Sequence, residues 1–544
     1  MRQLGFLMAA AAIGFFGLRP VHGQSAFNHS AGTNSWNSAA NWTPIGVPNA
    51  IGATILFDSP TGIRTVNLDS GATGFTAGSV TWNYTTAVSN QQFQVGTAGS
   101  RLFLNNGGAG ATLNFTGGGF SVGNQTISMA MTFDDNVTAN VDYAVTLGGT
   151  QITQGAFNWT GSAVGSGSFT KNGRGKLTMG TANKAYTGAT VLNGGRTRIS
   201  VAGRPSMTSS FTVNDGAQIT LISDGGVYTF GAGPTVPLNL NGTGLGLADV
   251  GFEGNFPGAI RNDTNLIATI NNNVVLKSDT LIHVQGAATG STTLAGNVSG
   301  VGRLEFTAIN SSDDLGKLVL GGLNSYTGGT LVNGGSLVVS PVSISALGTG
   351  NVTLQPFAAD AGARLIIQAG AANAIDDLAT LNLFGGGVAG ADAGFADLAA
   401  GINETVGGLI LGGFAQTIAG TYGSTASGAT FQNDEYFSGA GVINLVPTAV
   451  ADDADFNGDG EIDGADFLVW QRGLGAGTQS TGDANHNSMV DGADLDIWKT
   501  QLGTSGVAAG AVPEPATLAM LALSVIGIGL VRRRVCSPLS RLSQ

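Results

Sequence analysis

The fold of this protein is decided by a pattern that occurs twice, as GKLTMGTANKAYTGATVLNGGRTRIS (residues 175–200) and as GKLVLGGLNSYTGGTLVNGGSLVVS (residues 316–340). Each copy reads as a short alternating strand, a turn carrying Gly or Asn where φ must be positive, and another short strand. The shared positions are Lys176, Leu177, Asn183, Tyr186, Thr187, Gly188, Thr190, Asn193, Gly194 and Gly195, which recur as Lys317, Leu318, Asn324, Tyr326, Thr327, Gly328, Thr330, Asn333, Gly334 and Gly335. One unit cannot bury its apolar face alone, whereas stacked units bury a continuous core. The pattern therefore predicts an all-β solenoid.

The composition of the whole chain favours the same fold class. Gly accounts for 88 of the 544 residues and charged residues for only 10%, while hydrophobic residues reach 42%. These values indicate β structure with frequent tight turns rather than a charge-rich disordered polymer. Thr and Val suit pleated surfaces, and asparagines stacked at corners can hydrogen-bond along the axis of a solenoid. A chain of β-sandwiches is the alternative all-β interpretation.

The two copies resemble the autotransporter-associated β-strand repeat, whose pattern runs through Leu-x-Leu-x-Gly, Asn-x-Tyr-x-Gly and Asn-Gly-Gly. The resemblance implies a right-handed parallel β-helix displayed at a cell surface, which we expect over residues 151–447. Residues 402–446 also resemble the closing segment of proteins built from such repeats. Residues 24–150 are expected to form an N-terminal β region that includes the cap of the solenoid.

Tryptophans precede the repeats, in the stretch NSWNSAANWTPIGVPNAIGATILF (residues 34–57) and shortly after it. Aromatic residues beside polar ones can stack on sugar rings, so Trp36, Trp42 and Trp82 are candidates for carbohydrate binding. We favour the alternative for the first two, which is a cap that covers the apolar core and the unpaired strand edges at the end of the solenoid.

A calcium site is predicted in the stretch DADFNGDGEIDGADFLVWQRGLG, residues 453–475. Oxygen-bearing side chains alternate there as in a calcium loop, with Gly460 at the sharp bend and Glu461 supplying its backbone carbonyl. The predicted ligands of the first loop are Asp455, Asn457, Asp459, Glu461, Asp463 and Asp466. A second loop 28 residues later repeats them as Asp483, Asn485, Asn487, Met489 (backbone carbonyl), Asp491 and Asp494. A solvated acidic linker is the alternative interpretation.

The helices expected after the two loops repeat at the same offset. Phe467, Trp470 and Leu474 become Leu495, Trp498 and Leu502, which predicts one apolar face on each helix. The loop-helix pairs resemble a type I dockerin over residues 454–503, which implies a small all-α calcium module (residues 448–505) and possible docking to a cohesin-like surface protein. Asn487 replaces an acidic ligand and Ser488 a glycine, so the second site should be the weaker. The calcium would be structural.

Both ends of the chain are expected to be targeting segments. Residues 1–23 carry Arg2, a short apolar run and small residues, which is typical of a secretory signal; a retained membrane anchor is the alternative. Residues 511–534 contain Pro513, Glu514 and Pro515, then an apolar run and three arginines. This tail resembles the PEP-CTERM sorting signal, which implies a transmembrane sorting helix and recognition by an exosortase-type membrane protease. A simple tail anchor is the alternative.

The orientation of the tail follows from its arginines. Because arginines stay cytoplasmic, residues 535–544 are expected to be a cytoplasmic extension, and the residues before Pro513 are expected outside the inner membrane. We therefore expect an exported protein that is first anchored through its tail and then placed at the cell surface or outside the cell. The single cysteine, Cys536, excludes an internal disulfide framework.

The expected function is that of a non-catalytic exported surface protein, in which a β-helix has a structural or adhesive role. The chain lacks a His-x-x-x-His pair and a Gly-x-Ser-x-Gly motif, and Asp224, Asp313 and Asp314 read as solvated turn residues. The alternatives are a polysaccharide lyase or glycoside hydrolase built on the β-helix, and a protein that binds extracellular polysaccharide. The net charge of −12 argues against a nucleic-acid partner.

Overall fold

The computed structural model describes residues 23–503 with internal gaps. The gaps lie at residues 29–31, 59–63, 70–72, 85–90, 96–99, 118–124, 144, 148–149, 153–155, 247–256, 264, 286–289, 309–315, 342–345, 356–361, 372, 385–394, 448–452, 477, 479–480 and 485–488. The chain divides into two compact units, Met1–Pro447 and Thr448–Gln544.

The strands of the first unit form long sheets. In spatial order, the 12-stranded sheet contains β3 (Trp42–Thr43), β1 (Ser25–Phe27), β4 (Thr54–Asp58), β7 (Ser79–Tyr84), β10 (Ala111–Gly117), β13 (Val137–Tyr143), β18 (Phe169–Asn172), β20 (Thr190–Leu192), β22 (Phe211–Val213), β25 (Leu238–Leu240), β28 (Val274–Leu276) and β31 (Val298–Gly300). The 16-stranded sheet contains β2 (Gly32–Ser35), β5 (Arg64–Leu68), β8 (Gln91–Val95), β11 (Gln125–Ile127), β16 (Ala156–Trp159), β19 (Lys176–Met179), β21 (Gly195–Ile199), β23 (Ala217–Leu221), β26 (Ile260–Asn262), β29 (Thr280–Val284), β32 (Leu304–Thr307), β34 (Thr330–Val332), β36 (Val352–Leu354), β38 (Thr380–Leu383), β41 (Gly408–Leu411) and β42 (Phe414–Ala415).

The remaining strands form shorter sheets. A four-stranded sheet contains β17 (Ala163–Gly165), β12 (Ala130–Phe133), β9 (Arg101–Leu104) and β6 (Phe75–Ala77). An eight-stranded sheet contains β24 (Gly226–Tyr228), β27 (Ile267–Ile270), β30 (Ser291–Leu294), β33 (Lys317–Leu320), β35 (Gly335–Val339), β37 (Ala363–Ile367), β39 (Ala396–Leu398) and β45 (Phe437–Gly439). The others are β40 (Asn403–Val406), β46 (Val442–Leu445), β43 (Gly420–Gly423) and β44 (Phe431–Gln432) in a second four-stranded sheet, the pair β14 (Val145–Leu147) and β15 (Thr150–Ile152), and a 3-10 turn at Ala39–Asn41.

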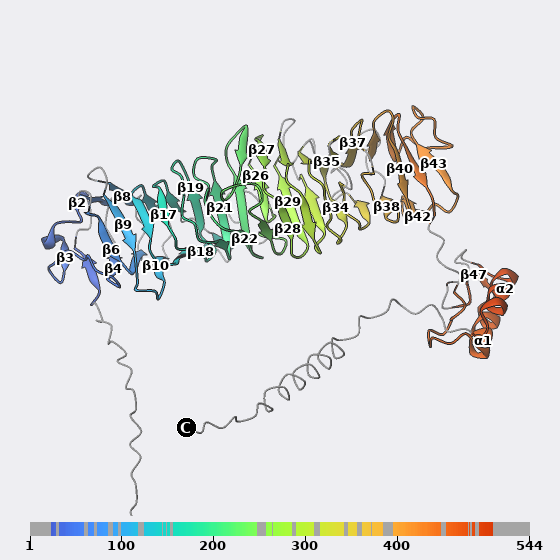
Figure 1. Ribbon diagram of the computed structural model, residues 1–544, viewed down its shortest axis with the longest axis horizontal. Coiled ribbons are helices and arrows are strands. Elements are labelled where there is room, and N and C mark those ends of the chain that lie inside the picture. Colours follow the sequence, from blue (N-terminus) through green and yellow to red (C-terminus); the bar gives the residue numbers. More distant parts are fainter. Residues whose placement is uncertain are drawn as a thin grey trace, which may run out of the picture. The chain divides into compact units, whose positions relative to one another are not determined.

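The chain of the first unit winds in three-sided coils. It passes from β7 through β8 and β9 and returns in β10, which pairs with β7 in parallel. The next coil repeats this path, with β11 pairing with β8 and β12 with β9. Figure 1 shows the strands of the first unit stacked side by side in successive coils. Most coils therefore add one parallel strand to each of three sheets. This parallel pairing confirms the predicted parallel β structure, and it rules out β-sandwiches, whose strands are antiparallel.

Inward-pointing side chains form one continuous core along the coils. In β4, for example, Ile55 and Phe57 are fully buried while their neighbours are partly exposed. Residues that pair across strands stack directly, so Phe57 lies 5.9 Å from Trp82, and Trp82 lies 4.6 Å from Phe115, between ring centroids. Alternation at period two thus gives each sheet an apolar inner face and a polar outer face.

Asparagines at the corner where the strands of the 12-stranded sheet end, and at the matching positions within β10 and β13, hydrogen-bond to one another along the stack. Each Nδ2 donates to the Oδ1 of the preceding asparagine, at 2.8 Å between Asn193 and Asn172 and at 2.6 Å between Asn214 and Asn193. The full ladder contains Asn114, Asn140, Asn172, Asn193, Asn214 and Asn241. The expectation that stacked asparagines bond along the axis is confirmed for this corner.

The tyrosine and threonine shared by the two repeats have a common role. Tyr186 and Tyr326 are fully buried, and their hydroxyl groups bond to the hydroxyl groups of Thr190 and Thr330 at 2.7 Å and 2.5 Å. Burial raises the pKa of both phenols, so each stays protonated. The pair satisfies two polar groups that the coil takes out of water.

The alignment of Asn183 with Asn324 is wrong by one position. Asn324 is buried two residues before Tyr326, where its Nδ2 donates to the carbonyl of Ala346 at 2.7 Å. In the first copy, Lys184 takes the buried place two residues before Tyr186, and Asn183 is exposed. The alternation of inward and outward side chains therefore decides the equivalence, rather than residue identity.

The two repeat copies lie on different sheets. In the first copy β19 and β21 belong to the 16-stranded sheet and β20 to the 12-stranded sheet. In the second copy β33 and β35 belong to the eight-stranded sheet and β34 to the 16-stranded sheet. The copies therefore differ by one face of the coil. The inward residues of both copies, such as Leu177 of β19 and Leu318 of β33, are nevertheless fully buried and apolar, so the same pattern fits either sheet.

The same sheets continue through the boundary that the sequence suggested near residue 150, since β13 pairs in parallel with β18. The N-terminal end is closed by β3, which pairs antiparallel with β1. Near the other end, β43 pairs antiparallel with β46 in the small sheet that also holds β40.

The second unit contains two short helices, α1 (Gly464–Gly473) and α2 (Gly492–Gln501), and the antiparallel pair β47 (Gly475–Ala476) and β48 (Met489–Val490). Its small core consists of Ala454, Phe456, Ile462 and Ala484, packed against Val469, Trp470, Ile497 and Trp498. Both helices begin at an aspartate in a capping box, which satisfies backbone N–H groups of the first turn.

The predicted apolar face of these helices is partly wrong. Leu474 and Leu502 are about half exposed, at 57% and 50%, because they follow the helices as C-cap residues. Val469 and Ile497 take their place in the packed face. In the part of the chain that the structure describes, neither of these helices nor any other is long and apolar enough to cross a membrane. The predicted sorting helix at residues 511–534 lies outside the described residues.

Candidate functional site

The first predicted calcium loop folds around the carboxylate of Asp455. Its Oδ1 accepts hydrogen bonds from the backbone N–H groups of Gly458 (2.8 Å) and Asp459 (3.2 Å), and its Oδ2 accepts from Gly460 (2.9 Å). Gly460 has a φ of +86°, and a Cβ added there would have no atom within 4 Å. Glycine is therefore required by the backbone conformation and not by crowding from neighbouring atoms. The acidic residue at the start of the loop thereby sets the bend that the spacing predicted.

The last residue of the same loop closes it from the helix side. Asp466 is fully buried, and its Oδ1 accepts from the N–H groups of Phe456 (2.8 Å) and Asn457 (3.1 Å). Its Oδ2 accepts from the N–H of Asp463 at 2.9 Å, which completes the capping box of α1. Asp455 and Asp466 thus hold the two ends of the loop together through main-chain amides.

The second loop repeats this arrangement as far as it is described. Asp494 is fully buried and accepts from the N–H of Asp491 at 2.8 Å, as Asp466 does from Asp463. Asp483 is also buried, and Met489 lies in β48. The predicted ligands Asn485 and Asn487 lie outside the described residues.

The two loop-helix halves are joined reciprocally. Trp470 of α1 donates its indole N–H to the carbonyl of Asp491, and Trp498 of α2 donates to the carbonyl of Asp463, at 2.8 Å and 2.9 Å. The ring of Phe467 lies 5.1 Å from that of Trp498. Each helix therefore binds the loop of the other half. The two halves, which are duplicated at an offset of 28 residues, are thus related by an approximate two-fold symmetry.

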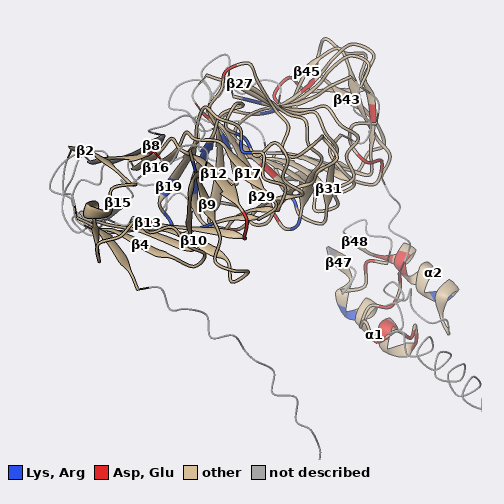
Figure 2. Ribbon diagram, turned by 60° about the vertical axis from the view of Figure 1, so that its left-hand side comes forward, with Lys and Arg blue, Asp and Glu red and all other residues tan. Residues whose placement is uncertain are grey.

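The donor set suits calcium by its chemistry, because it offers hard oxygen atoms on alternate residues of a tight loop. Each carboxylate oxygen has two lone pairs, so a hydrogen bond from a main-chain amide leaves acceptor capacity. Within the described residues, however, no three His, Cys, Asp or Glu side chains form a group that could hold a metal ion. The calcium sites thus stay a prediction. Acidic residues do gather where each loop meets its helix (Figure 2).

The tryptophans considered for carbohydrate binding are core residues. Trp36, Trp42 and Trp82 are all fully buried, so none offers a ring face to a sugar. The indole N–H of Trp42 donates to the carbonyl of Trp36 at 2.8 Å, and their rings lie 5.1 Å apart in an edge-to-face arrangement. The prediction that these residues could stack on sugar rings is therefore wrong. The first two instead fill the core where β1 and β3 close the end.

The acidic candidates for catalysis do not form a described site. Asp224 is exposed in a turn, where its Oδ1 accepts from the N–H groups of Gly225 and Ile267 at 3.0 Å each. This is the turn role that its sequence context indicates. Asp313 and Asp314 lie outside the described residues.

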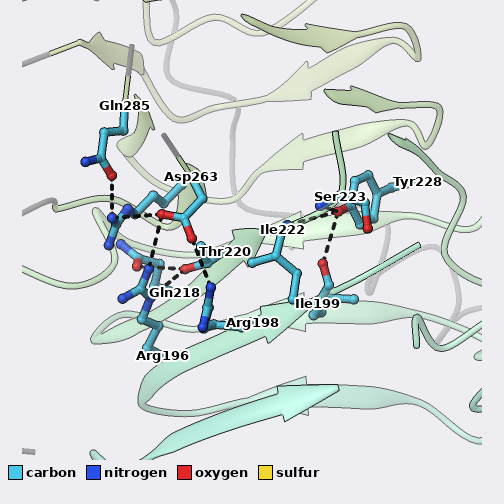
Figure 3. A network of polar contacts seen from close by, with 11 residues as sticks. Arg196, Arg198, Ile199, Gln218, Thr220, Ile222, Ser223, Tyr228, Asp263 and Gln285 are labelled. Carbon is cyan, nitrogen blue, oxygen red and sulfur yellow. Dashed lines mark hydrogen bonds and ion pairs between the residues drawn. The ribbon is translucent and has the colours of Figure 1, made fainter. Parts of the chain in front are cut away.

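A cluster of arginines on the 16-stranded sheet was not predicted from the sequence. Arg198 of β21 and Arg261 of β26 each lie 3.1 Å from a carboxylate oxygen of Asp263, and Arg196 lies 3.9 Å away (Figure 3). Arg261 also donates to Gln285. Charged pairs of this kind tie coils together across a partly buried face. The contact between Arg198 and Asp263 joins residues 65 positions apart, and no local pattern signals it.

Two buried lysines are a second unpredicted feature. Lys184 lies over the ring of Trp159, with 4.9 Å from Nζ to the ring centroid, and donates to the carbonyl of Ala182. Lys171 donates to the carbonyls of Gly173 (2.8 Å) and Gly194 (2.5 Å). Burial lowers the pKa of each amine to about 7. The sequence does contain a signal for their burial, because both lysines occupy inward positions in the alternation of inward and outward side chains.

The sequence comparisons extend to segments outside the described residues. A family model of the passenger-associated-transport-repeat matches residues 169–199 and 313–339. A model of the PEP-CTERM protein-sorting motif matches residues 511–534, which contain Pro513, Glu514 and Pro515. No curated protein and no solved structure matches the chain. The two matches indicate an exported, membrane-associated protein with passenger-type repeats whose sorting motif is processed by an exosortase, a membrane protease.

Proposed function

We propose that this protein is a non-enzymatic, adhesive or structural component of the cell surface or extracellular matrix. The observation that carries the proposal is the combination of passenger-type repeats, folded as stacked parallel coils, with a sorting motif on the same chain. Stacked coils make a large surface from short units, which suits a scaffold or adhesive face. A right-handed winding belongs to the proposal, since parallel crossovers are right-handed in about 98% of cases.

The module of α1 and α2 is proposed to be a calcium-dependent docking or spacer module between the solenoid and the tail. Asp455, Asp459 and Asp466 would hold the ion in the first loop, with Asn457, Asp463 and the carbonyl of Glu461. Calcium, when bound, supplies positive charge that offsets repulsion among the carboxylates of each loop. The hydrophobic core of the described part of this unit has four buried residues, Ala454, Phe456, Ile462 and Ala484. A core that small gives little stability by itself.

The calcium proposal is tested by titration of the full-length protein. Isothermal titration calorimetry should detect two sites, the second weaker, and the helix-unfolding transition should move to higher temperature with calcium. Asp455→Asn should remove the stronger site and Asp483→Asn the weaker one, with Asp224→Asn as a matched control outside the loops. Absence of heat together with an unchanged unfolding transition at millimolar calcium would contradict the proposal.

The export proposal is tested separately in cells. The wild-type protein should be found at the surface or in the medium, shortened at both ends. Replacement of Pro513, Glu514 and Pro515 by alanine should leave the protein in the membrane fraction with its tail intact. Equal release of the variant and the wild type would contradict processing at this motif.

A further inference from the structure

A groove of about 620 Å³ is open on the outer face of the 16-stranded sheet. Its floor is formed by Leu331, Thr353 and Asn382, which lie side by side on β34, β36 and β38. These side chains point outward, since the residues that flank them on each strand, such as Leu354 and Leu383, are fully buried. The groove therefore crosses three successive coils.

The two walls of the groove come from opposite ends of these strands. Gln355 and Phe384 follow β36 and β38 on one side, and Phe384 is 41% exposed. Gly328, Gly350 and Asn351 line the other side. A Cβ at Gly350 would lie 2.4 Å from the backbone nitrogen of Gly329, so the close stacking of the coils requires glycine at this wall.

The polar groups of the groove are neutral and include an unsatisfied acceptor. Asn382 Oδ1 is shielded from solvent and has no hydrogen-bond partner among the described residues. Arg303, the charged residue of the described lining, is already paired with Asp279 at 3.2 Å and with Glu305. Because Asn382 Oδ1 is out of reach of a ligand, contacts fall to the accessible hydroxyl and amide groups of the lining, such as those of Thr353, Gln355 and Asn351, which suit a ligand with O–H groups. The paired arginine offers little attraction to an anion.

We propose that this groove binds a neutral polysaccharide. Phe384 provides an apolar face for the C–H side of a sugar ring, and Thr353, Gln355 and Asn351 provide hydroxyl and amide groups for its hydroxyls. Strands in a sheet are about 4.8 Å apart, so three rungs extend over about 10 Å. That length accommodates two units of an extended glycan. The binding site is independent of the calcium loops and of the sorting tail.

The proposal is tested with the full-length protein and soluble polysaccharides of known charge. Affinity electrophoresis and calorimetry would compare galactomannan and xyloglucan, which are neutral, with alginate, which is anionic. We expect binding to at least one neutral polymer and none to alginate. Binding to alginate alone, or to no polymer, would overturn the proposal.

Variants assign the binding to the groove. Phe384→Ala should weaken binding about tenfold, which corresponds to about 1.4 kcal/mol, because it removes the apolar face on which a sugar ring would pack. Gln355→Leu, which keeps a similar volume and removes an exposed amide of the lining, should weaken it as well. Phe414→Ala is the matched control, because Phe414 is 77% exposed on β42 and does not line the groove. Circular dichroism melting curves verify folding. Equal affinities of the groove variants and the control would place binding elsewhere and refute the proposal.

Discussion

Trp470 and Asp491 are joined by a hydrogen bond of 2.8 Å from the indole N–H to the main-chain carbonyl, across the two halves of the second unit. The same bond occurs between Trp498 and Asp463. Asp463 and Asp491 are also the N-cap residues of α1 and α2. In each half, one aspartate therefore caps its own helix with its side chain. Its main-chain carbonyl accepts a hydrogen bond from the tryptophan of the other helix.

Trp470→Phe and Trp498→Phe should lower the stability of this unit by similar amounts, about 0.5–1.5 kcal/mol, because each removes one indole donor. Differential scanning calorimetry of the full-length protein, at fixed calcium, would measure the transition of the unit. Leu468→Ala is a suitable control, since Leu468 is a 46% exposed residue of α1. A loss confined to one tryptophan would contradict the reciprocal arrangement.

Asn193→Ala should destabilise the solenoid by about 1–2 kcal/mol, because it removes two ladder bonds of 2.8 Å and 2.6 Å. Asn333→Ala, at the matching position of the second repeat, lies outside the ladder and should cost less. Denaturant unfolding of both variants gives the comparison. Equal losses would mean that the turn conformation, rather than the ladder, accounts for the effect.

Lys184 should make the stability of the solenoid depend on pH. Its pKa is about 7 in the folded state and 10.5 without burial, so the unfolded chain binds more protons between these values. Stability should therefore rise from pH 7 towards pH 10. Lys184→Asn, which introduces the residue found at Asn324, should remove this part of the slope and leave the contribution of Lys171. Urea unfolding at several pH values tests the prediction, and an unchanged slope would contradict it.

Glu404 should act in the opposite direction. Burial raises the pKa of its carboxyl to about 7, although Oε1 accepts the N–H of Ile375 at 2.8 Å. Because the folded pKa lies above the ordinary 4.5, stability present at low pH should be lost as the pH rises from 4.5 through 7. Glu404→Gln keeps an acceptor and should be more stable than the wild type at pH 8 but not at pH 4. Melting temperatures at both values would show whether the curves converge.

The sequence predicted a β solenoid because Tyr186, Thr190 and their counterparts recur at matching places in a periodic pattern. The parallel pairing was expected from the resemblance to the repeat family. The sequence also predicted the helices of the second unit, since Phe467 and Trp470 recur with the same helical spacing as Leu495 and Trp498. Patterns of this kind are local, so a short stretch of sequence is enough to predict the turn or strand that it forms.

The features that the sequence did not reveal depend on neighbours far along the chain. Arg198 meets Asp263 only because coils stack, and Thr353 meets Asn382 for the same reason. The identity of Asn183 suggested an equivalence that the alternation of side chains overrules in favour of Lys184. Trp82 is an aromatic residue of the kind that stacks on sugar rings. Its side chain is fully buried in the core, however, so it offers no ring face to a sugar.

The asparagine ladder has a direction, since every amide in it donates towards the N-terminus. Asn172 to Asn193 and Asn193 to Asn214 are both 21 positions apart. Removal of one such turn would bring Asn214 next to Asn172 with donor and acceptor still matched. Whole turns can therefore be gained or lost by recombination without leaving an unpaired donor or acceptor in the ladder. When the chain is synthesised from its N-terminus, each new turn also finds the acceptor of its asparagine bond already in place on the turn before it.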